Sequence, residues 1–276
     1  MVKKAPAKLV FCMKWGTRYG AEYVNRLYRS VKTHTTGPVQ VVCFTDDTKG
    51  IVKAVDCRPL PAFKNVRADL ANKPWRKLSL WQKGLGKDLA GRDALFLDLD
   101  LVIAGSLDDF WAYCPGKYAV WENPSKPGTD VGNTSVFRFK VGSEPEIYER
   151  FMKNPVRLYE KEFRIEQEFI SARLGTGAAA RVGRNPAVAA DAFYKGKNLQ
   201  VFWPKGWVVS FKEDLLPAWP MRLWRNVPLP AGARVVAFHG KPDPDEAARG
   251  HWPEKKWWKR FYKRLRPVHW ISLNWR

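Results

Sequence analysis

Cysteine and long apolar runs are scarce in this sequence. Only four cysteines occur among 276 residues, and no two of them form a CxxC pair. A disulfide-rich secreted domain or a zinc ribbon needs more cysteines at closer spacing, so we expect reduced, mostly buried thiols. No run of about 18 apolar residues occurs, so we expect no helix that spans a bilayer. The apolar stretch at residues 9–13 is too short for a signal-peptide core, so we also expect no secretion.

Acidic residues are scarce as well. The sequence has 27 Asp and Glu against 48 Lys and Arg, a formal net charge of +21. This excess favours anionic partners such as nucleotides, nucleic acid or an acidic membrane. Hydrophobic residues make up 45%, with 14 Trp, 15 Phe and 9 Tyr, enough apolar surface to exclude a disordered chain. The length fits one large domain or two small ones.

Strand and helix patterns alternate in the first half. Residues 9–13 and 39–44 are typical of strands, and Tyr23, Leu27 and Val31 between them have helical spacing. A further strand is predicted at residues 51–55, a helix at 78–85, and a central strand at 94–103. This alternation predicts an α/β fold with parallel strands.

The second half has a less regular pattern, which predicts a mixed sheet. Helices are predicted near residues 144–152 and 166–174, and strands at residues 118–121, 135–139, 207–211 and 235–238. The composition changes near residue 249, beyond which nine Lys or Arg stand against a single acid, Glu254. We therefore expect one domain over residues 1–248 and a basic aromatic tail over residues 249–276.

Two aspartates, Asp98 and Asp100, interrupt the apolar run 94–103. Strand side chains alternate, so both carboxylates are predicted on one face. Burying two ionised carboxylates side by side is costly unless a cation neutralises them. Oxygen ligands suit Mn²⁺ or Mg²⁺, which keep open positions for nucleotide phosphates. Alternatively, the two acids cap a strand end by accepting backbone N–H groups.

The surrounding segment, LFLDLDLVIAGSLDDFW at residues 95–111, resembles the DxD segment of family 8 glycosyltransferases, which include glycogenin and bacterial lipopolysaccharide galactosyltransferases. Further similar pieces follow the order of that family. They are Lys77-Leu78, the segment NTSVF at residues 133–137, Glu166-Gln167 and the segment FHGKP at residues 238–242. The resemblance covers residues 9–244.

This resemblance implies a GT-A fold, with a Rossmann-like nucleotide-binding half and a mixed central sheet. A nucleoside diphosphate sugar, most simply a UDP-sugar, would lie across the strand ends. The implied ligands of Mn²⁺ (or Mg²⁺) are Asp98, Asp100 and His239, and the implied donor-binding residues are Trp15, Tyr19, Lys77, Asp98 and Lys241. Two alternatives stay open: residues 15–19 form an ordinary strand-to-helix turn, and His239 is a hydrogen-bonded residue at a strand end.

The resemblance also implies residues at the reacting sugar, namely Asn133, Glu166 and Gln167. Glu166 stands where the family has Asp, and one more methylene moves a carboxylate by roughly 1 Å, which matters where groups must align. Lys241 would stabilise the leaving diphosphate, but it follows His239 more closely than is usual in the family. Alternatively, Glu166 and Gln167 are polar residues on an exposed helix. The family retains anomeric configuration, so a retaining transfer is expected.

Aromatic and basic residues interleave in the tail. At about 100° per residue, the aromatic and leucine positions fall on one arc of roughly 140°, with Lys and Arg opposite; these positions are Trp257, Trp258, Phe261, Tyr262 and Leu265. This predicts an amphipathic helix that lies in anionic headgroups, with Trp270 and Trp275 extending the anchor. Alternatively, the apolar arc packs on the protein itself. Nucleic acid is the least favoured partner, because no nucleic-acid-binding motif is present.

Together these features predict a metal-dependent glycosyltransferase, peripheral at the cytoplasmic membrane face. It would move a sugar from a nucleoside diphosphate donor to a glycan or glycolipid acceptor, as in lipopolysaccharide biosynthesis. The alternative is a non-catalytic basic protein on the same scaffold that binds a membrane or nucleic acid.

Overall fold

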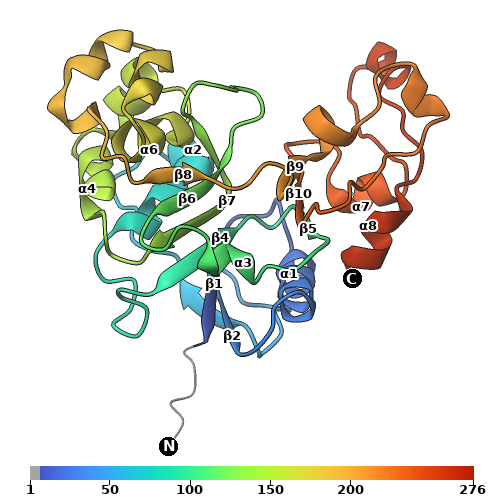
Figure 1. Cartoon of the computed structure of the whole chain (residues 1–276), viewed down its shortest axis with the longest axis horizontal. Coiled ribbons are helices and arrows are strands. Elements are labelled where there is room, and N and C mark those ends of the chain that lie inside the picture. Colours follow the sequence, from blue (N-terminus) through green and yellow to red (C-terminus); the bar gives the residue numbers. More distant parts are fainter. Residues whose placement is uncertain (1–6) are drawn as a thin grey trace, which may run out of the picture.

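The computed structural model describes residues 7–276, so most of the basic start of the chain lies outside the described residues. Its main feature is a seven-stranded sheet with the order β3-β2-β1-β4-β7-β6-β8 (Figure 1). Strands β3, β2, β1 and β4 are parallel, β7 is antiparallel to β4 and β6, and β8 is parallel to β6. This mixed sheet confirms the predicted fold class. Its strands are β1 (Lys8–Lys14), β2 (Val39–Thr45), β3 (Asp56–Pro59), β4 (Asp93–Leu97), β6 (Tyr118–Glu122), β7 (Gly132–Lys140) and β8 (Gln200–Phe202).

A second sheet of three strands has the order β5-β10-β9 and connects the main sheet to the C-terminal part (Figure 1). Strand β10 pairs antiparallel with β5 and parallel with β9. These strands are β5 (Leu101–Ile103), β9 (Val208–Ser210) and β10 (Val235–Ala237).

The predicted continuous strand at residues 94–103 is wrong. Strand β4 ends at Leu97, and β5 begins at Leu101 in the other sheet, so Asp98 and Asp100 lie in the turn between the sheets. The turn is fixed by the Asp98 N–H, which donates to the Ser135 carbonyl at 3.0 Å, and by the Asp100 carbonyl, which accepts from the backbone N–H of residue 238 at 3.3 Å. The carboxylates are thereby kept out of the sheet interior, where their burial would be unfavourable.

The alternation of side chains along β1 separates two cores. Leu9, Phe11 and Met13 pack into the core that includes residues of α4 and α6, and Val10 and Cys12 into the core that includes residues of α1 and the small sheet. Both faces of the large sheet are therefore covered, as its continuous apolar strands require.

Helix α1 (Ala21–Thr33) buries Tyr23, Leu27 and Val31, as their spacing predicts.

The predicted strand at residues 51–55 is wrong, because this segment is a turn that precedes β3. The helix predicted at 78–85 is a 3₁₀ helix, η1, that ends before Gly84. The remaining helices are α2 (Ala68–Ala71), η1 (Pro74–Trp81), α3 (Asp109–Ala112), α4 (Pro145–Lys153), α5 (Pro155–Arg157), η2 (Leu158–Glu162), α6 (Glu166–Leu174), η3 (Ala178–Val182), η4 (Pro186–Ala190), η5 (Ala192–Tyr194), η6 (Phe211–Leu215), η7 (Met221–Leu223), α7 (Pro244–Ala248), η8 (Trp257–Arg260) and α8 (His269–Asn274).

The amphipathic helix predicted in the tail is wrong. The segment forms only the short η8, followed by turns, before α8 begins. A helix there would place Lys255 beside Lys259, and Lys259 beside Lys263. Like charges four residues apart destabilise a helix, and aromatic residues are only moderate helix formers.

The end of the tail packs against the body beside α1 (Figure 1). The Trp275 ring lies 5.1 Å from the Tyr23 ring and 4.2 Å from the Arg26 guanidinium. The Trp270 indole N–H donates to the Val227 carbonyl at 3.0 Å. Trp270 and Trp275 therefore do not extend an anchor. In the described part of the chain, the helices are too short or too polar to traverse a bilayer.

Candidate active site

One cavity of about 620 Å³ lies at the carboxyl ends of β1 and β4, the usual place for ligands in α/β sheets. The turn after β1, the Asp98–Asp100 turn and the chain after β10 supply most of its wall. Seven of the ten predicted site residues line it, namely Trp15, Tyr19, Lys77, Asp98, Asp100, Gln167 and His239. Asn133, Glu166 and Lys241 do not.

Asp98 is bound by a buried lysine. Lys77, only 4% exposed, donates from Nζ to Asp98 Oδ2 at 2.7 Å and to the Thr134 carbonyl at 3.0 Å. The ammonium thus neutralises one of the two carboxylates. The Lys77 side chain leaves the N-terminal half of η1, so this 3₁₀ helix positions a cation at the base of the cavity.

Asp100 lies beside a second acid and a tyrosine. Burial and the neighbouring Asp98 carboxylate raise the pKa of Asp100 to about 7, although Tyr19 donates its hydroxyl to Asp100 Oδ2 at 2.8 Å. Burial and the Asp100 carboxylate raise the pKa of Tyr19, so Tyr19 remains a neutral donor. The two acids therefore repel each other, as expected for a pair that a cation would stabilise.

The two carboxylates fit a divalent cation. In the described residues, Asp98 Oδ1 and Asp100 Oδ1 accept no hydrogen bond, while Oδ2 of each is already bonded. Hard oxygen atoms of this kind suit Mg²⁺ or Mn²⁺. Residues 7–276 contain no preformed group of three His, Cys, Asp or Glu side chains that could hold a metal ion. The predicted three-ligand arrangement is therefore not assembled.

The third predicted metal ligand, His239, does not form a preformed group with Asp98 and Asp100. Its ring stacks on Trp121, with centroids 5.4 Å apart and planes at 14°, and its Nε2 is buried with no hydrogen-bond partner among the described residues. Burial and the nearby Lys212 ammonium lower the pKa of His239, so the imidazole is neutral and can donate an electron pair. An unpartnered buried nitrogen of this kind is costly unless a ligand completes it.

Two further cations line the cavity and were not predicted. Lys14, 5% exposed at the end of β1, donates to the Asp47 carbonyl at 3.4 Å. Arg18 lies 3.6 Å from Asp243 and over the Tyr19 ring at 4.9 Å. Their position at the end of β1 and in the turn that follows it was the available signal, because groups at strand ends face ligands.

Of the three residues expected at the reacting sugar, Gln167 faces the cavity, and Asn133 and Glu166 do not. Gln167 lines the cavity, and its Oε1 accepts from the Asn123 amide at 2.8 Å. Glu166, 2% exposed, accepts from the Thr134 hydroxyl at 2.7 Å, and burial raises its pKa. Asn133 accepts from the Ser135 N–H at 2.9 Å. The α6 side chain presented to a ligand is therefore the amide and not the acid.

Lys241 points away from the cavity. Its ammonium lies 2.6 Å from both Asp243 and Glu246, at the start of α7. Gly240, between His239 and Lys241, has φ +66°, a conformation that glycine readily adopts, and the chain turns there. Another cation, Lys212, donates to the His239 carbonyl.

A scan against models of protein families finds no match, and a search of curated proteins finds none either. Solved structures do match. The glycosyltransferase GlyE of Streptococcus pneumoniae TIGR4 has a TM-score of 0.50 at 12% identity, over 86% of this chain and 56% of that chain. Its apo form has a TM-score of 0.51 at 11% identity, over 87% and 56%. The bifunctional glycosyltransferase WbbM has a TM-score of 0.51 at 12% identity, over 87% and 47%.

The chain thus spans about half the length of these solved structures. The likeness shows a glycosyltransferase fold, and it agrees with the GT-A fold that the resemblance to family 8 implied.

Proposed function

We propose that this chain is a metal-dependent glycosyltransferase that takes a sugar from a nucleoside diphosphate donor, with UDP as the nucleotide, and transfers it to a glycan or glycolipid. The observation that carries this proposal is the cavity at the strand ends, in which Asp98 and Asp100 converge. Three cations line the same cavity, namely Lys14, Arg18 and Lys77. Paired acids for a metal and cations for a diphosphate are the chemistry that such a donor requires.

Each lining residue receives a role from its position. Trp15 and Tyr19, in the turn after β1, would pack against the base and ribose. Lys14 and Arg18 would bind diphosphate oxygens, a role that the resemblance gave to Lys241. Gln167 would hydrogen-bond the donor sugar. Glu166 and Asn133 would support that face from behind, through Thr134 and Ser135.

Mn²⁺ or Mg²⁺ would be held by Asp98 and Asp100, with His239 Nε2 as the third proposed protein ligand. When bound, the ion would neutralise charge on the diphosphate. Lys77 keeps Asp98 oriented while leaving Oδ1 free. The transfer is proposed to retain anomeric configuration, which NMR of the product anomer would test.

Calorimetric titration of UDP with and without Mn²⁺ tests this function. Wild-type protein should bind UDP more tightly with Mn²⁺, and Asp100→Ala should lose that gain, about tenfold or more. Asp69→Ala is the matched control, because Asp69 is exposed and pairs only with surface cations. Metal-independent UDP binding in a folded wild type would remove the basis of the proposal and favour the non-catalytic alternative. If Mn²⁺ strengthens UDP binding as expected, a hydrolysis screen of nucleotide sugars with Mn²⁺ would identify the donor.

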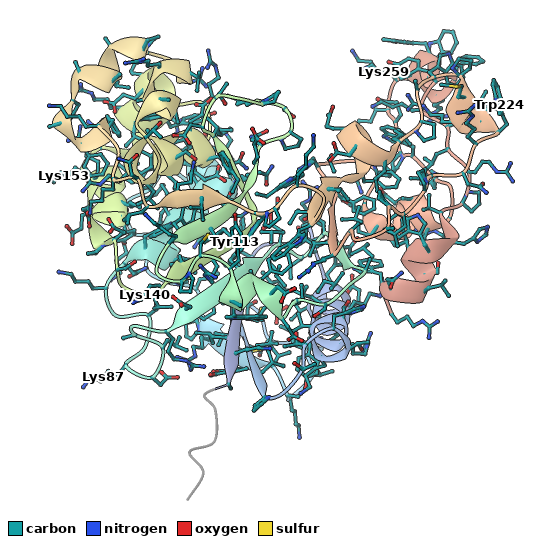
Figure 2. All side chains as sticks on the ribbon, viewed as in Figure 1. Lys87, Tyr113, Lys140, Lys153, Trp224 and Lys259 are labelled. Atoms are coloured by element: carbon teal, nitrogen blue, oxygen red, sulfur yellow. The ribbon has the colours of Figure 1, made fainter. Side chains whose placement is uncertain are left out.

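The membrane surface is proposed as a second partner. Seven large apolar side chains, 36–71% exposed, come from two segments of the C-terminal part, and they are Trp219, Met221, Leu223, Trp224, Trp257, Trp258 and Phe261. The Arg266 guanidinium donates to the Trp224 carbonyl at 3.1 Å and links the first of these segments to the tail. Trp224 and Lys259 lie at the same corner of the molecule (Figure 2). Exposed aromatic residues beside Lys and Arg suit an anionic lipid surface at the cytoplasmic face.

Pelleting with vesicles that contain phosphatidylglycerol tests this surface. The double variant Trp224→Ser with Trp257→Ser should lose most of its vesicle binding, because both side chains are exposed and apolar. The double variant Lys87→Gln with Lys153→Gln is the control for charge. It removes two positive charges at exposed positions far from this corner (Figure 2) and should pellet like wild type. Equal pelleting of all three proteins would contradict the proposal.

A further inference from the structure

A second cavity, of about 900 Å³, opens beside the candidate active site. Gly240 lines the first cavity, and the next residue, Lys241, lines the second, so one segment of the chain forms part of both walls. We name the second cavity the basic groove. Its lining residues are Lys241, Gly250, His251, Trp252, Pro253, Glu254, Lys255, Arg260, Lys263 and Arg264, with five Lys or Arg against one acid.

The cations of the groove are only partly neutralised. Lys263 pairs with Glu254, and Lys241 pairs with acids of α7. Lys255 and Arg264 are exposed, and neither side chain makes a hydrogen bond or ion pair with the described residues. Two free cations therefore remain on the wall.

A tryptophan at the groove gathers further positive charge. The cationic groups of Lys212, Arg222 and Lys263 lie 6.0, 5.7 and 5.5 Å from the Trp252 ring. Burial and the nearby Lys263 lower the pKa of Lys212, which shows that the charges crowd one another. Such crowding is unfavourable without an anion, and the indole offers an apolar surface beside the charges.

We infer that the basic groove binds an acidic group, a phosphate or a carboxylate, on the acceptor sugar. This inference rests on the proposed function, since the donor would occupy the first cavity and a transfer requires the acceptor beside it. The groove has the charge for the acidic group, and Trp252 has the flat apolar surface for a sugar ring. Free Lys255 and Arg264 supply charge-assisted hydrogen bonds.

Titration of inorganic phosphate tests the groove directly. The double variant Lys255→Gln with Arg264→Gln should bind phosphate about tenfold more weakly than wild type. Two matched doubles should bind like wild type or lose less, namely Lys87→Gln with Lys153→Gln at distant exposed sites, and Lys14→Gln with Arg18→Gln in the first cavity. Equal binding by the groove variant and wild type, or no measurable binding by wild type, would overturn the inference.

Two further measurements separate the sources of the anion and the two proposals. Galacturonic acid should bind wild type more tightly than galactose, and the groove variant should lose that preference. If the groove variant loses only phosphatidylglycerol vesicle binding and keeps the preference, the anion is a lipid headgroup and the acceptor assignment fails. Manganese-dependent UDP affinity is measured in parallel on wild type, and its absence counts against the glycosyltransferase proposal and not against the groove.

Discussion

Arg138 is fully buried in the middle of β7, and no carboxylate among residues 7–276 forms an ion pair with it. Its guanidinium donates to the carbonyls of Phe110 at 2.7 Å, Trp111 at 3.1 Å and Cys114 at 2.7 Å. Burial lowers its pKa. The side chain therefore holds the segment that leads into β6 by hydrogen bonds to its backbone carbonyls.

Replacing this arginine should be strongly destabilising. Arg138→Met removes the guanidinium donors of the Phe110, Trp111 and Cys114 carbonyls, of which only that of Cys114 keeps a second donor, the Lys117 N–H, outside the helix, so the free energy of unfolding should fall by about 3 kcal/mol. Urea unfolding followed by circular dichroism measures the change. Arg181→Met is the control, because Arg181 is exposed, and it should change stability by less than about 0.5 kcal/mol. Indistinguishable midpoints for the two variants would contradict the assigned role.

Single residues also show which parts of the site could be predicted. Asp98 and Asp100 were recognisable because paired acids inside an apolar run need an explanation. Glu166 and Gln167 could not be distinguished, because which of two neighbours on α6 faces a cavity depends on how that helix packs. Lys241 was assigned by its place in a motif, but the acids of α7 neutralise it. Such pairing depends on folded geometry and is absent from the local pattern.

Between elements, Asp108 ties the start of α3 to two distant segments. Its carboxylate accepts from Lys8 in β1 at 2.5 Å, from the Thr36 N–H at 3.0 Å and from the Thr36 hydroxyl at 2.8 Å. Burial alone would raise its pKa, but the hydrogen bonds from Lys8 and Thr36 lower the pKa of Asp108 to about 2. The ionised form therefore stabilises the folded state.

The Asp108→Asn variant should lose this stabilisation in a pH-dependent way. A lowered folded-state pKa gives stability that is present above the unfolded pKa, near 4, and is lost as the pH falls through about 2. Wild type should exceed the variant by about 1–2 kcal/mol at pH 7, and the gap should close between about pH 4 and pH 2. Urea unfolding at several pH values measures it. Asp109→Asn, at an exposed neighbouring pair, should cost less than about 1 kcal/mol, and a gap independent of pH would refute the linkage.

Helices and strands were predicted correctly where the apolar residues follow one regular spacing. The predictions were wrong where a second factor opposed that spacing or where the run was apolar throughout. The strands at β1 and β2 and the helix α1 match their predicted positions, because their apolar spacing is regular. The run at 94–103 was apolar throughout, so its break after Leu97 depended on a change of sheet that no periodicity records. In the tail, the aromatic spacing fitted a helix, but repulsion between neighbouring lysines opposes it.

For the whole molecule, the tail is divided between an exposed aromatic part and a part that closes the core. Trp257 is 71% exposed, whereas Trp275 is 6% exposed and packs against Tyr23 and Arg26 of α1. The Arg29 guanidinium also donates to the backbone carbonyl of residue 276 at 2.9 Å. The last residues thus join the C-terminal part to the half that contains β1 and α1, while the preceding aromatic residues face outward.

These two tryptophans should therefore behave oppositely on substitution. Trp275→Ala should lower the free energy of unfolding by about 3 kcal/mol, because it removes a large buried ring, whereas Trp257→Ala should change it by less than about 0.5 kcal/mol. In vesicle pelleting the order should reverse, with Trp257→Ala weakened and Trp275→Ala unchanged at a temperature where it remains folded. Thermal unfolding and pelleting on the same preparations give both orders. If Trp275→Ala is as stable as wild type, residues 268–276 do not close the core, and the tail is a separate appendage.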